Sequence, residues 1–166
     1  HLPVEGVTGT NGKTTVTHLL GQIIEASGRT SGIVGTIGAR IGRIEESVAR
    51  TTPEASDLQR LLAEMIDAGV DVAAIEVSSH ALSLHRVDAI RFRVAAFTNL
   101  MQDHLDYHGD MARYAGAKQR LFVTPGLRWA AAELRTGEVV LWDLRGGEVV
   151  GRWRDGDAAN LNGLAV

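Results

Sequence analysis

The feature that most constrains the fold is a short apolar run that breaks into a glycine-containing turn and then into a helical pattern. Residues 3–8 form the run, and Gly9-Thr10-Asn11-Gly12 form the turn. Apolar side chains then recur every three or four residues, the period of one buried helix face, up to Gly28; they are Val16, Leu19, Leu20, Ile23 and Ile24. The predicted order is strand, glycine loop, helix.

A second strand region and helix are predicted between residues 31 and 69. Residues 31–44 are rich in Gly, Ile and Val with a period near two, which predicts one or two short strands. Thr52-Pro53 then predicts an N-cap and first helical position, because proline there loses no needed hydrogen bond. That helix should bury one stripe of side chains, Leu58, Leu61, Leu62, Met65 and Ile66.

Two further strands and a last helix complete the pattern. Residues 70–77 and 94–97 are apolar runs typical of parallel strands covered on both faces. Alternating strands and helices predict an α/β fold, a P-loop NTPase-like parallel sheet flanked by helices. Asp110 can cap the last helix, whose predicted inner stripe is Met111, Tyr114, Ala115, Lys118, Leu121 and Phe122.

The pattern changes after residue 126, which predicts a division into residues 1–126 and a divergent β-hairpin tail, 127–166. Residues 139–143 and 148–150 flank Arg145-Gly146-Gly147, as in an antiparallel hairpin. Residues 141–144, Leu-Trp-Asp-Leu, resemble part of a WD-repeat blade. A single blade cannot close a propeller, so a local hairpin or a foreign tail is the preferred interpretation.

The composition excludes several classes of protein. The chain has no cysteine, which excludes disulfides, thiolate metal sites and a cysteine nucleophile. With 17 basic and 20 acidic residues, the net charge of −3 gives no reason to expect nucleic acid as a partner. No apolar run approaches the length needed to span or insert into a membrane. The first residue is His1 rather than Met, and no basic and then apolar leader is seen, so we expect a cytoplasmic fragment of a longer chain.

The glycine turn has the chemistry of a phosphate-binding loop. Backbone N–H groups and the helix N-terminus face phosphate oxygens, Lys13 reaches the outer phosphates, and the Thr14 hydroxyl reaches Mg²⁺. The strict P-loop pattern has a glycine where Val7 stands, so a plain glycine turn is the alternative. The predicted nucleotide-binding set is Gly9, Thr10, Asn11, Gly12, Lys13, Thr14 and Thr15.

Three further features carry chemistry. Glu76 is costly inside a strand unless it binds a cation, so it is a candidate Mg²⁺ ligand, with an arginine partner as the alternative. Lys118, one of only two lysines, falls on a buried helix stripe, where the neutral amine is favoured and can react with carbon dioxide to give an anionic carbamate. A snorkelling lysine is the alternative. Residues 103–109 supply acids and imidazoles for a second metal or a substrate, or form a solvated loop.

Together these motifs resemble the central ATPase domain of the Mur ligases, the amide ligases of peptidoglycan precursors. The resemblance covers about residues 4–126 and is closest to the branch that adds the third amino acid. It is carried by Thr8 to Thr15, by Thr51-Thr52-Pro53-Glu54, by residues 76–82, and by residues 99–109 with 114–122 around Lys118. Leu84 and Met101-Gln102 depart from the residues that are common in that family.

The resemblance implies a role for each matched residue. Lys13 and its loop would bind ATP, Thr14 and Glu76 would hold one Mg²⁺, and His104 with carbamylated Lys118 would hold or support a second. Lys13, His104 and Lys118 are thereby the implied catalytic residues. The residues that would contact the UDP-muramoyl dipeptide are Thr51, Thr52, Ser78 and Arg86.

The implied reaction joins a carboxylate to the amine of an incoming amino acid through an acyl phosphate. The carboxylate and the γ-phosphate of ATP are both anions, so metal ions and Lys13 must neutralise their charge when they meet. Family members carry N- and C-terminal domains for the uridine nucleotide and the amino acid, which residues 1–166 lack, so we expect weak nucleotide binding and no ligation by this chain alone. A folate or cyanophycin-type ligase and a non-catalytic nucleotide-binding remnant with an interaction tail are the alternatives. Diaminopimelate and lysine both stay open as the added residue.

Overall fold

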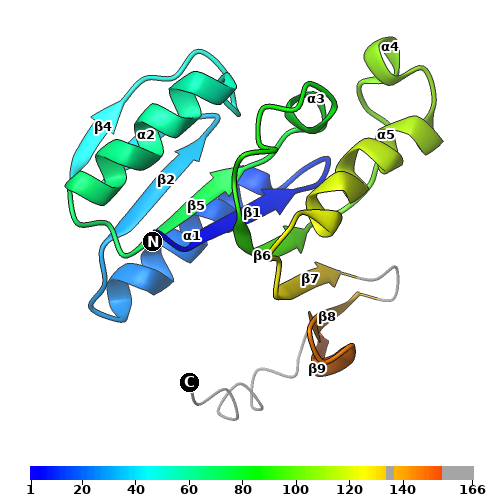
Figure 1. The fold of residues 1–166 in the computed structure, drawn as a ribbon. Helices are drawn as coiled ribbons and strands as arrows, with labels where there is room; N and C mark the ends of the chain where they lie inside the picture. The colour runs from blue at the N-terminus through cyan, green and yellow to red at the C-terminus, as the bar shows by residue number, and fades with distance from the viewer. Residues whose placement is uncertain (134–136, 155–166) are drawn as a thin grey trace.

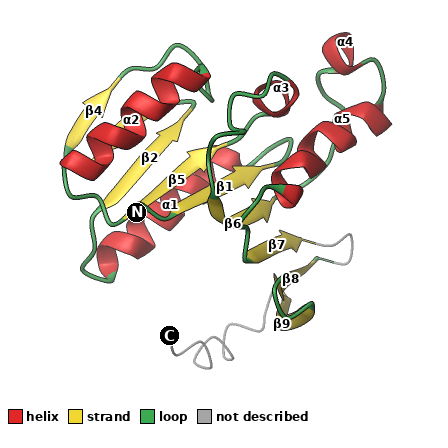
Figure 2. Ribbon diagram, in the orientation of Figure 1, coloured by secondary structure: helices red, strands yellow, loops and turns green. Residues whose placement is uncertain are grey.

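The computed structural model describes residues 1–133 and 137–154, which form one mixed sheet with helices on both faces (Figures 1 and 2). Parallel strands occupy the middle of the sheet, and antiparallel strands extend it at both ends. In spatial order the strands are β4 (Ile44–Glu46), β3 (Gly38–Ile41), β2 (Ser31–Gly35), β5 (Val72–Glu76), β1 (Val4–Thr8), β6 (Phe92–Phe97), β7 (Trp129–Glu133), β8 (Glu138–Asp143) and β9 (Glu148–Arg154).

The helices connect the parallel strands. Helix α1 (Lys13–Ala26) lies on one face of the sheet, and α2 (Ala55–Asp67) and α5 (Met111–Gln119) lie on the other (Figure 1), as right-handed crossovers require. Short helices α3 (Ser79–Ser83) and α4 (Leu105–His108) follow β5 and β6, and a 3₁₀ turn, η1 (Arg120–Val123), follows α5. The predicted α/β fold is confirmed. Among the helices of the described ranges, none is long and apolar enough to cross a membrane.

Helix α1 buries only part of the predicted stripe. Ile24 is buried as predicted, together with Thr17 and Gly21, whereas Leu19 and Ile23 are 51% and 64% exposed, so their predicted burial is wrong. A Cβ atom at Gly21 would lie 2.7 Å from Cδ1 of Ile33 in β2. At Gly21 the helix therefore lies close to the sheet, and the side chains of Leu19 and Ile23 point outward.

Helix α2 begins later than predicted. Its N-cap is Glu54 and its first residue is Ala55, so the prediction of Thr52-Pro53 as cap and first turn is wrong. The Thr52 hydroxyl instead donates to the backbone oxygen of Glu76 at 2.8 Å, which holds residues 52 and 53 outside the helix. The predicted stripe is buried except for Ile66, which is 55% exposed; its buried members are Leu58, Leu61, Leu62 and Met65.

The remaining elements follow the predictions with local differences. Residues 31–44 contain the starts of three strands rather than one or two, and the strand predicted over 70–77 spans Val72–Glu76. Asp110 caps α5 as predicted, because its side chain accepts a hydrogen bond from the Arg113 amide at 2.8 Å. The apolar stripe continues past α5 through η1, where Leu121 is buried.

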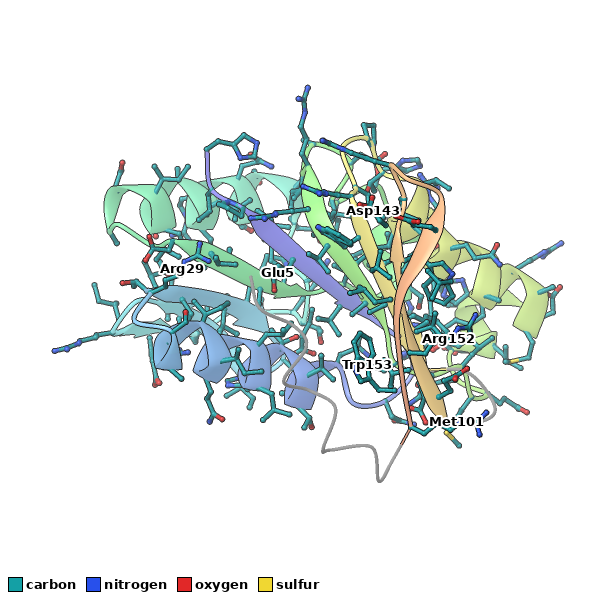
Figure 3. All side chains as sticks on the ribbon, turned by 90° about the horizontal axis from the view of Figure 1, so that it is seen from below. Glu5, Arg29, Met101, Asp143, Arg152 and Trp153 are labelled. Carbon is teal, nitrogen blue, oxygen red and sulfur yellow. The ribbon has the colours of Figure 1, made fainter. Side chains whose placement is uncertain are left out.

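The C-terminal strands join the main sheet. Strands β8 and β9 form the predicted hairpin, but β7, which was not predicted, pairs in parallel with β6 and antiparallel with β8. These strands lie at the end of the sheet opposite to Arg29, as Asp143, Arg152 and Trp153 show (Figure 3). The sheet thus continues across residue 126, although the proposed division there remains a prediction; residues 155–166 of the predicted tail lie outside the described residues.

Candidate functional site

The carboxyl ends of β1, β5 and β6 meet at one edge of the sheet, where ligands bind in folds of this class. The glycine loop follows β1, Glu76 ends β5, and Thr98 and Asn99 follow β6. The Thr98 hydroxyl donates to the Asn11 backbone oxygen at 2.6 Å, and the Asn99 side-chain oxygen accepts from the Asn11 amide at 3.0 Å. The end of β6 therefore holds the loop in place.

Two glycines give this loop its shape. Gly9 has φ +144° and Gly12 has φ +81°, values that side chains rarely allow. A Cβ atom at Gly9 would also lie only 1.8 Å from the Thr98 hydroxyl oxygen. Gly12 is the N-cap of α1 and provides no side-chain cap, so the first turn directs backbone N–H groups and the positive end of the helix dipole toward the loop. Such an end favours an anion.

Lys13 lies over this loop. Its Nζ atom donates to the backbone oxygens of Gly9 at 3.0 Å and Thr10 at 2.9 Å. Burial lowers the pKa of the Lys13 amine, and the nearby carboxylates of Glu76 and Asp103 oppose that shift. Among the described residues, the amine is therefore held at the loop by backbone oxygens, contacts that an anionic phosphate can replace.

The Glu76 carboxylate is fully buried and accepts three hydrogen bonds. Thr14 Oγ1 and Thr36 Oγ1 lie 2.9 and 3.1 Å from Oε2, and the Thr36 amide nitrogen lies 3.0 Å from Oε1. Among the described residues no arginine forms an ion pair with Glu76, so the arginine-partner alternative is wrong there. The predicted pair Thr14 and Glu76 is in direct contact. Thr36, which lies inside the region 31–44 predicted to contain short strands, was missed.

Lys118 is 2% exposed, as its position on the helix stripe predicted, so the snorkelling alternative is wrong. Its Nζ atom donates to the Gly9 backbone oxygen at 2.7 Å and lies 4.6 Å from the centre of the Tyr114 ring. Burial, reinforced by the positive charge of Lys13, lowers the pKa of Lys118 to about 8. Two amines, Lys13 and Lys118, therefore donate to the same carbonyl oxygen.

A cluster of rings borders Lys118. The Tyr114 hydroxyl lies 3.0 Å from Thr10 Oγ1, and the ring of His104 lies 6.2 Å from that of Tyr114 and 4.8 Å from that of His80. Burial, followed by the charge of His104, lowers the pKa of His80 and of His108. His104 is exposed with φ 52°. Within the described ranges, no group of three or more His, Asp or Glu side chains is arranged to hold a metal ion.

The predicted substrate residues come together in one pocket of about 330 Å³. Arg86 is positioned by Thr52, whose backbone oxygen lies 3.3 Å from Nη1, and by Glu54, whose carboxylate lies 2.9 Å from Nη2. The pocket thus combines hydroxyl donors with two arginines, a lining that suits an anion. Its lining residues are Arg50, Thr51, Thr52, Ser78, His80, Leu84, Arg86 and His104.

Comparison with known proteins supports the resemblance seen in the sequence. The family model of the Mur ligase middle domain matches residues 7–128. The chain is 50% identical over 131 residues to the UDP-N-acetylmuramoyl-L-alanyl-D-glutamate--2,6-diaminopimelate ligase of Alkalilimnicola ehrlichii, covering 79% of this chain and 26% of that protein. For the ligase of the same name from Synechococcus elongatus, the identity is 52% over 130 residues, covering 78% and 26%.

Solved structures show the same fold. A structure of a ligase with that same name superposes with a TM-score of 0.65 at 26% identity, covering 90% of this chain and 39% of the other. E. coli FolC in complex with DHPP and ADP superposes with a TM-score of 0.57 at 18% identity, covering 91% and 47%. The chain spans about a quarter of the length of the curated relatives it matches. The family match over residues 7–128 shows that this chain belongs to the Mur ligase family, as its middle domain.

Proposed function

We propose that the chain is the ATP-binding part of a ligase that adds 2,6-diaminopimelate to UDP-N-acetylmuramoyl-L-alanyl-D-glutamate, the activity of the muramoyl-tripeptide synthetase (MurE) branch. The observation that carries this proposal is one sheet edge where the glycine loop, the Thr14–Glu76 pair and the Lys118 amine converge. The names of the relatives, at about half identity, supply the substrates.

The residues at this edge fit Mg²⁺. Thr14 and Glu76 offer neighbouring hard oxygen atoms, which this ion prefers. Mg²⁺ is usually held by one or two carboxylates together with substrate phosphates and water, so a larger cluster of protein ligands is not required. When bound, the ion would neutralise charge on the phosphates, and His104 and Lys118 would support a second ion.

The chain's own residues then serve the reaction as follows. The loop amides and the α1 N-terminus bind the phosphates of ATP, and Lys13 exchanges its backbone partners for the γ-phosphate. Arg86, with the pocket hydroxyls, orients the substrate carboxylate, which attacks the γ-phosphorus while the bond to ADP breaks. The amino group of the incoming residue then attacks the acyl carbon, and phosphate leaves.

A first test is the effect of Mg²⁺ on ADP affinity, measured by calorimetric titration. We expect weak ADP binding that Mg²⁺ tightens, and a loss of about tenfold in the Mg²⁺-bound affinity for Thr14→Val, the effect of one lost oxygen contact to a charged group. The control is Thr30→Val, which should match the wild type. Thr30 is exposed and lies just before the first residue of β2, whereas the site lies at the carboxyl ends of the strands. Equal ADP affinity with and without Mg²⁺ in the wild type would contradict the proposal.

A second test concerns the carbamate on Lys118. A neutral amine adds to carbon dioxide and releases one proton, and the resulting anion replaces the repulsion between Lys118 and Lys13 by attraction. Because the pKa of Lys118 is lowered to about 8, the neutral fraction rises as the pH passes through that value. With ¹³C-labelled carbon dioxide, we expect a carbamate resonance that grows between pH 7 and pH 9.

The control for the carbamate is Lys118→Arg, which keeps the positive charge but has no reactive amine. Any signal that this variant retains comes from the N-terminal amine or Lys13, and the difference spectrum isolates Lys118. A difference spectrum without a carbamate resonance at pH 9 rejects this modification.

A further inference from the structure

Thr36, the residue directly after β2, contacts both the candidate metal ligand and the substrate pocket. Its Oγ1 atom lies 3.1 Å from Oε2 of Glu76 and 3.0 Å from Oγ1 of Thr51, and its amide nitrogen lies 3.0 Å from Oε1 of Glu76. Thr51 lines the pocket of about 330 Å³. Thr36, an exposed residue, therefore connects Glu76 with the pocket. The family resemblance implies Mg²⁺ as the ligand of Glu76 and the UDP-muramoyl dipeptide as the ligand of the pocket.

The direction of these hydrogen bonds follows from the number of available protons. A carboxylate only accepts, so the single hydroxyl proton of Thr36 points to Glu76. The Thr36 oxygen can then only accept from Thr51, whose proton points toward it. The chain of donation runs from Thr51 to Thr36 to Glu76, and each bond polarises the next.

The end of β2 is shaped to receive the carboxylate. A Cβ atom at Gly35 would lie 2.1 Å from Oε1 and 2.6 Å from Cδ of Glu76, so only glycine leaves the required space. With Gly35 beside it and both polar groups of Thr36 bound to it, the carboxylate is held from the β2 side. Among the described residues, the one other group that donates a hydrogen bond to the carboxylate is the Thr14 hydroxyl.

We propose that Thr36 is a positioning residue that orients the Glu76 carboxylate for the metal ion and couples it to the substrate pocket through Thr51. An anion in the pocket that accepts the Thr51 proton removes the donor to Thr36, and this weakens the bond from Thr36 to Glu76. The occupancy of the pocket thereby changes how firmly the carboxylate is held. The inference rests on the proposed nucleotide and metal site.

The test measures metal binding rather than ligation. The 166-residue chain saturated with ADP is titrated with Mn²⁺, and free Mn²⁺ is followed by electron paramagnetic resonance. We expect Thr36→Val to weaken Mn²⁺ binding about tenfold, the loss of one hydrogen bond to a charged group. Thr36→Ser, which keeps the hydroxyl, should restore wild-type affinity. The affinity for ADP in the presence of EDTA should be the same in all of these variants, because Thr36 faces the carboxylate and not the loop.

A double-mutant cycle tests the coupling. Thr51→Val should weaken Mn²⁺ binding by about threefold, and the Thr36→Val/Thr51→Val variant should bind no more weakly than Thr36→Val alone, because both act through one chain of hydrogen bonds. Thr30→Val is again the matched control. If Thr36→Val fails to give the wild-type circular dichroism spectrum, Thr36→Ala takes its place with the same expected loss, since the residue is exposed and leaves no cavity.

The outcomes separate the two proposals. Strong Mn²⁺ binding by the wild type and equally strong binding by Thr36→Val would overturn the role of Thr36 and leave the nucleotide site standing. Additive losses in the double variant would overturn the coupling through Thr51. A wild-type ADP complex that holds no Mn²⁺ would overturn the metal site itself and the inference with it.

Discussion

Replacing Gly9 by alanine is expected to abolish nucleotide binding and to lower the free energy of unfolding by about 3 kcal/mol or more. The new Cβ atom would lie 1.8 Å from the Thr98 hydroxyl oxygen and 3.1 Å from the Asn99 amide nitrogen, at a φ of +144°. Thr98 would have to move, and with it the hydrogen bond that holds the Asn11 carbonyl. Urea unfolding and ADP titration measure the two effects.

Gly116→Ala provides the matched control for Gly9→Ala. Gly116 lies inside α5, and a Cβ atom there would meet nothing within 4 Å. Because alanine is favoured over glycine in a helix interior, this substitution should stabilise the chain by about 0.5–1 kcal/mol and leave ADP binding unchanged. Similar unfolding curves for the two alanine variants would show that the close approach of Gly9 to Thr98 does not exclude a side chain at position 9.

The second large effect is expected for Glu76→Gln, which should keep the fold and remove metal binding. The amide oxygen can still accept from the Thr36 amide, and the hydroxyls of Thr14 and Thr36 can rotate to accept from the new NH₂ group. We therefore expect a change in unfolding free energy of about 1 kcal/mol or less. The negative charge is lost, however, and Mn²⁺ affinity in the ADP complex should fall about 100-fold.

The control for Glu76→Gln is Glu64→Gln. Glu64 is a partly exposed carboxylate on α2 that pairs with Arg60 at 2.7 Å and, among the described residues, forms no ion pair or hydrogen bond with the loop. A surface pair of this kind contributes little to stability, so this variant should match the wild type in both measurements. If Glu76→Gln bound Mn²⁺ as tightly as the Glu64→Gln control, Glu76 would not be a metal ligand.

The features that were predicted correctly are those with a local signature. The glycine loop is short and contiguous, and Lys118 and Glu76 stand out because a charge interrupts an otherwise apolar pattern. The rule that parallel strands share one carboxyl edge predicted that the glycine loop and Glu76 lie together. The place of Lys118 beside them came from the resemblance to the Mur ligases, because a helix stripe predicts burial but not the neighbours of the buried side chain.

The features that were missed depend on pairing between distant segments. Strand β7 has the sequence Trp-Ala-Ala-Ala-Glu, which favours a helix locally and becomes a strand because it lies between β6 and β8. Thr36 resembles any exposed loop threonine until the pairing of β2 with β5 places it beside Glu76. The outward turn of Leu19 likewise depends on how closely α1 approaches the sheet.

The shared carbonyl of Gly9 has a consequence for regulation. Lys118 in α5 and Lys13 in α1 both donate to that one oxygen, although Lys118 is 109 residues from Gly9 along the chain. Any ligand that draws Lys13 away changes the electrostatic neighbourhood of Lys118, and by thermodynamic reciprocity the protonation or carbamylation of Lys118 changes the affinity of the loop for that ligand. The proposed carbamate on Lys118 would thereby link the concentration of carbon dioxide to nucleotide binding through a single peptide group.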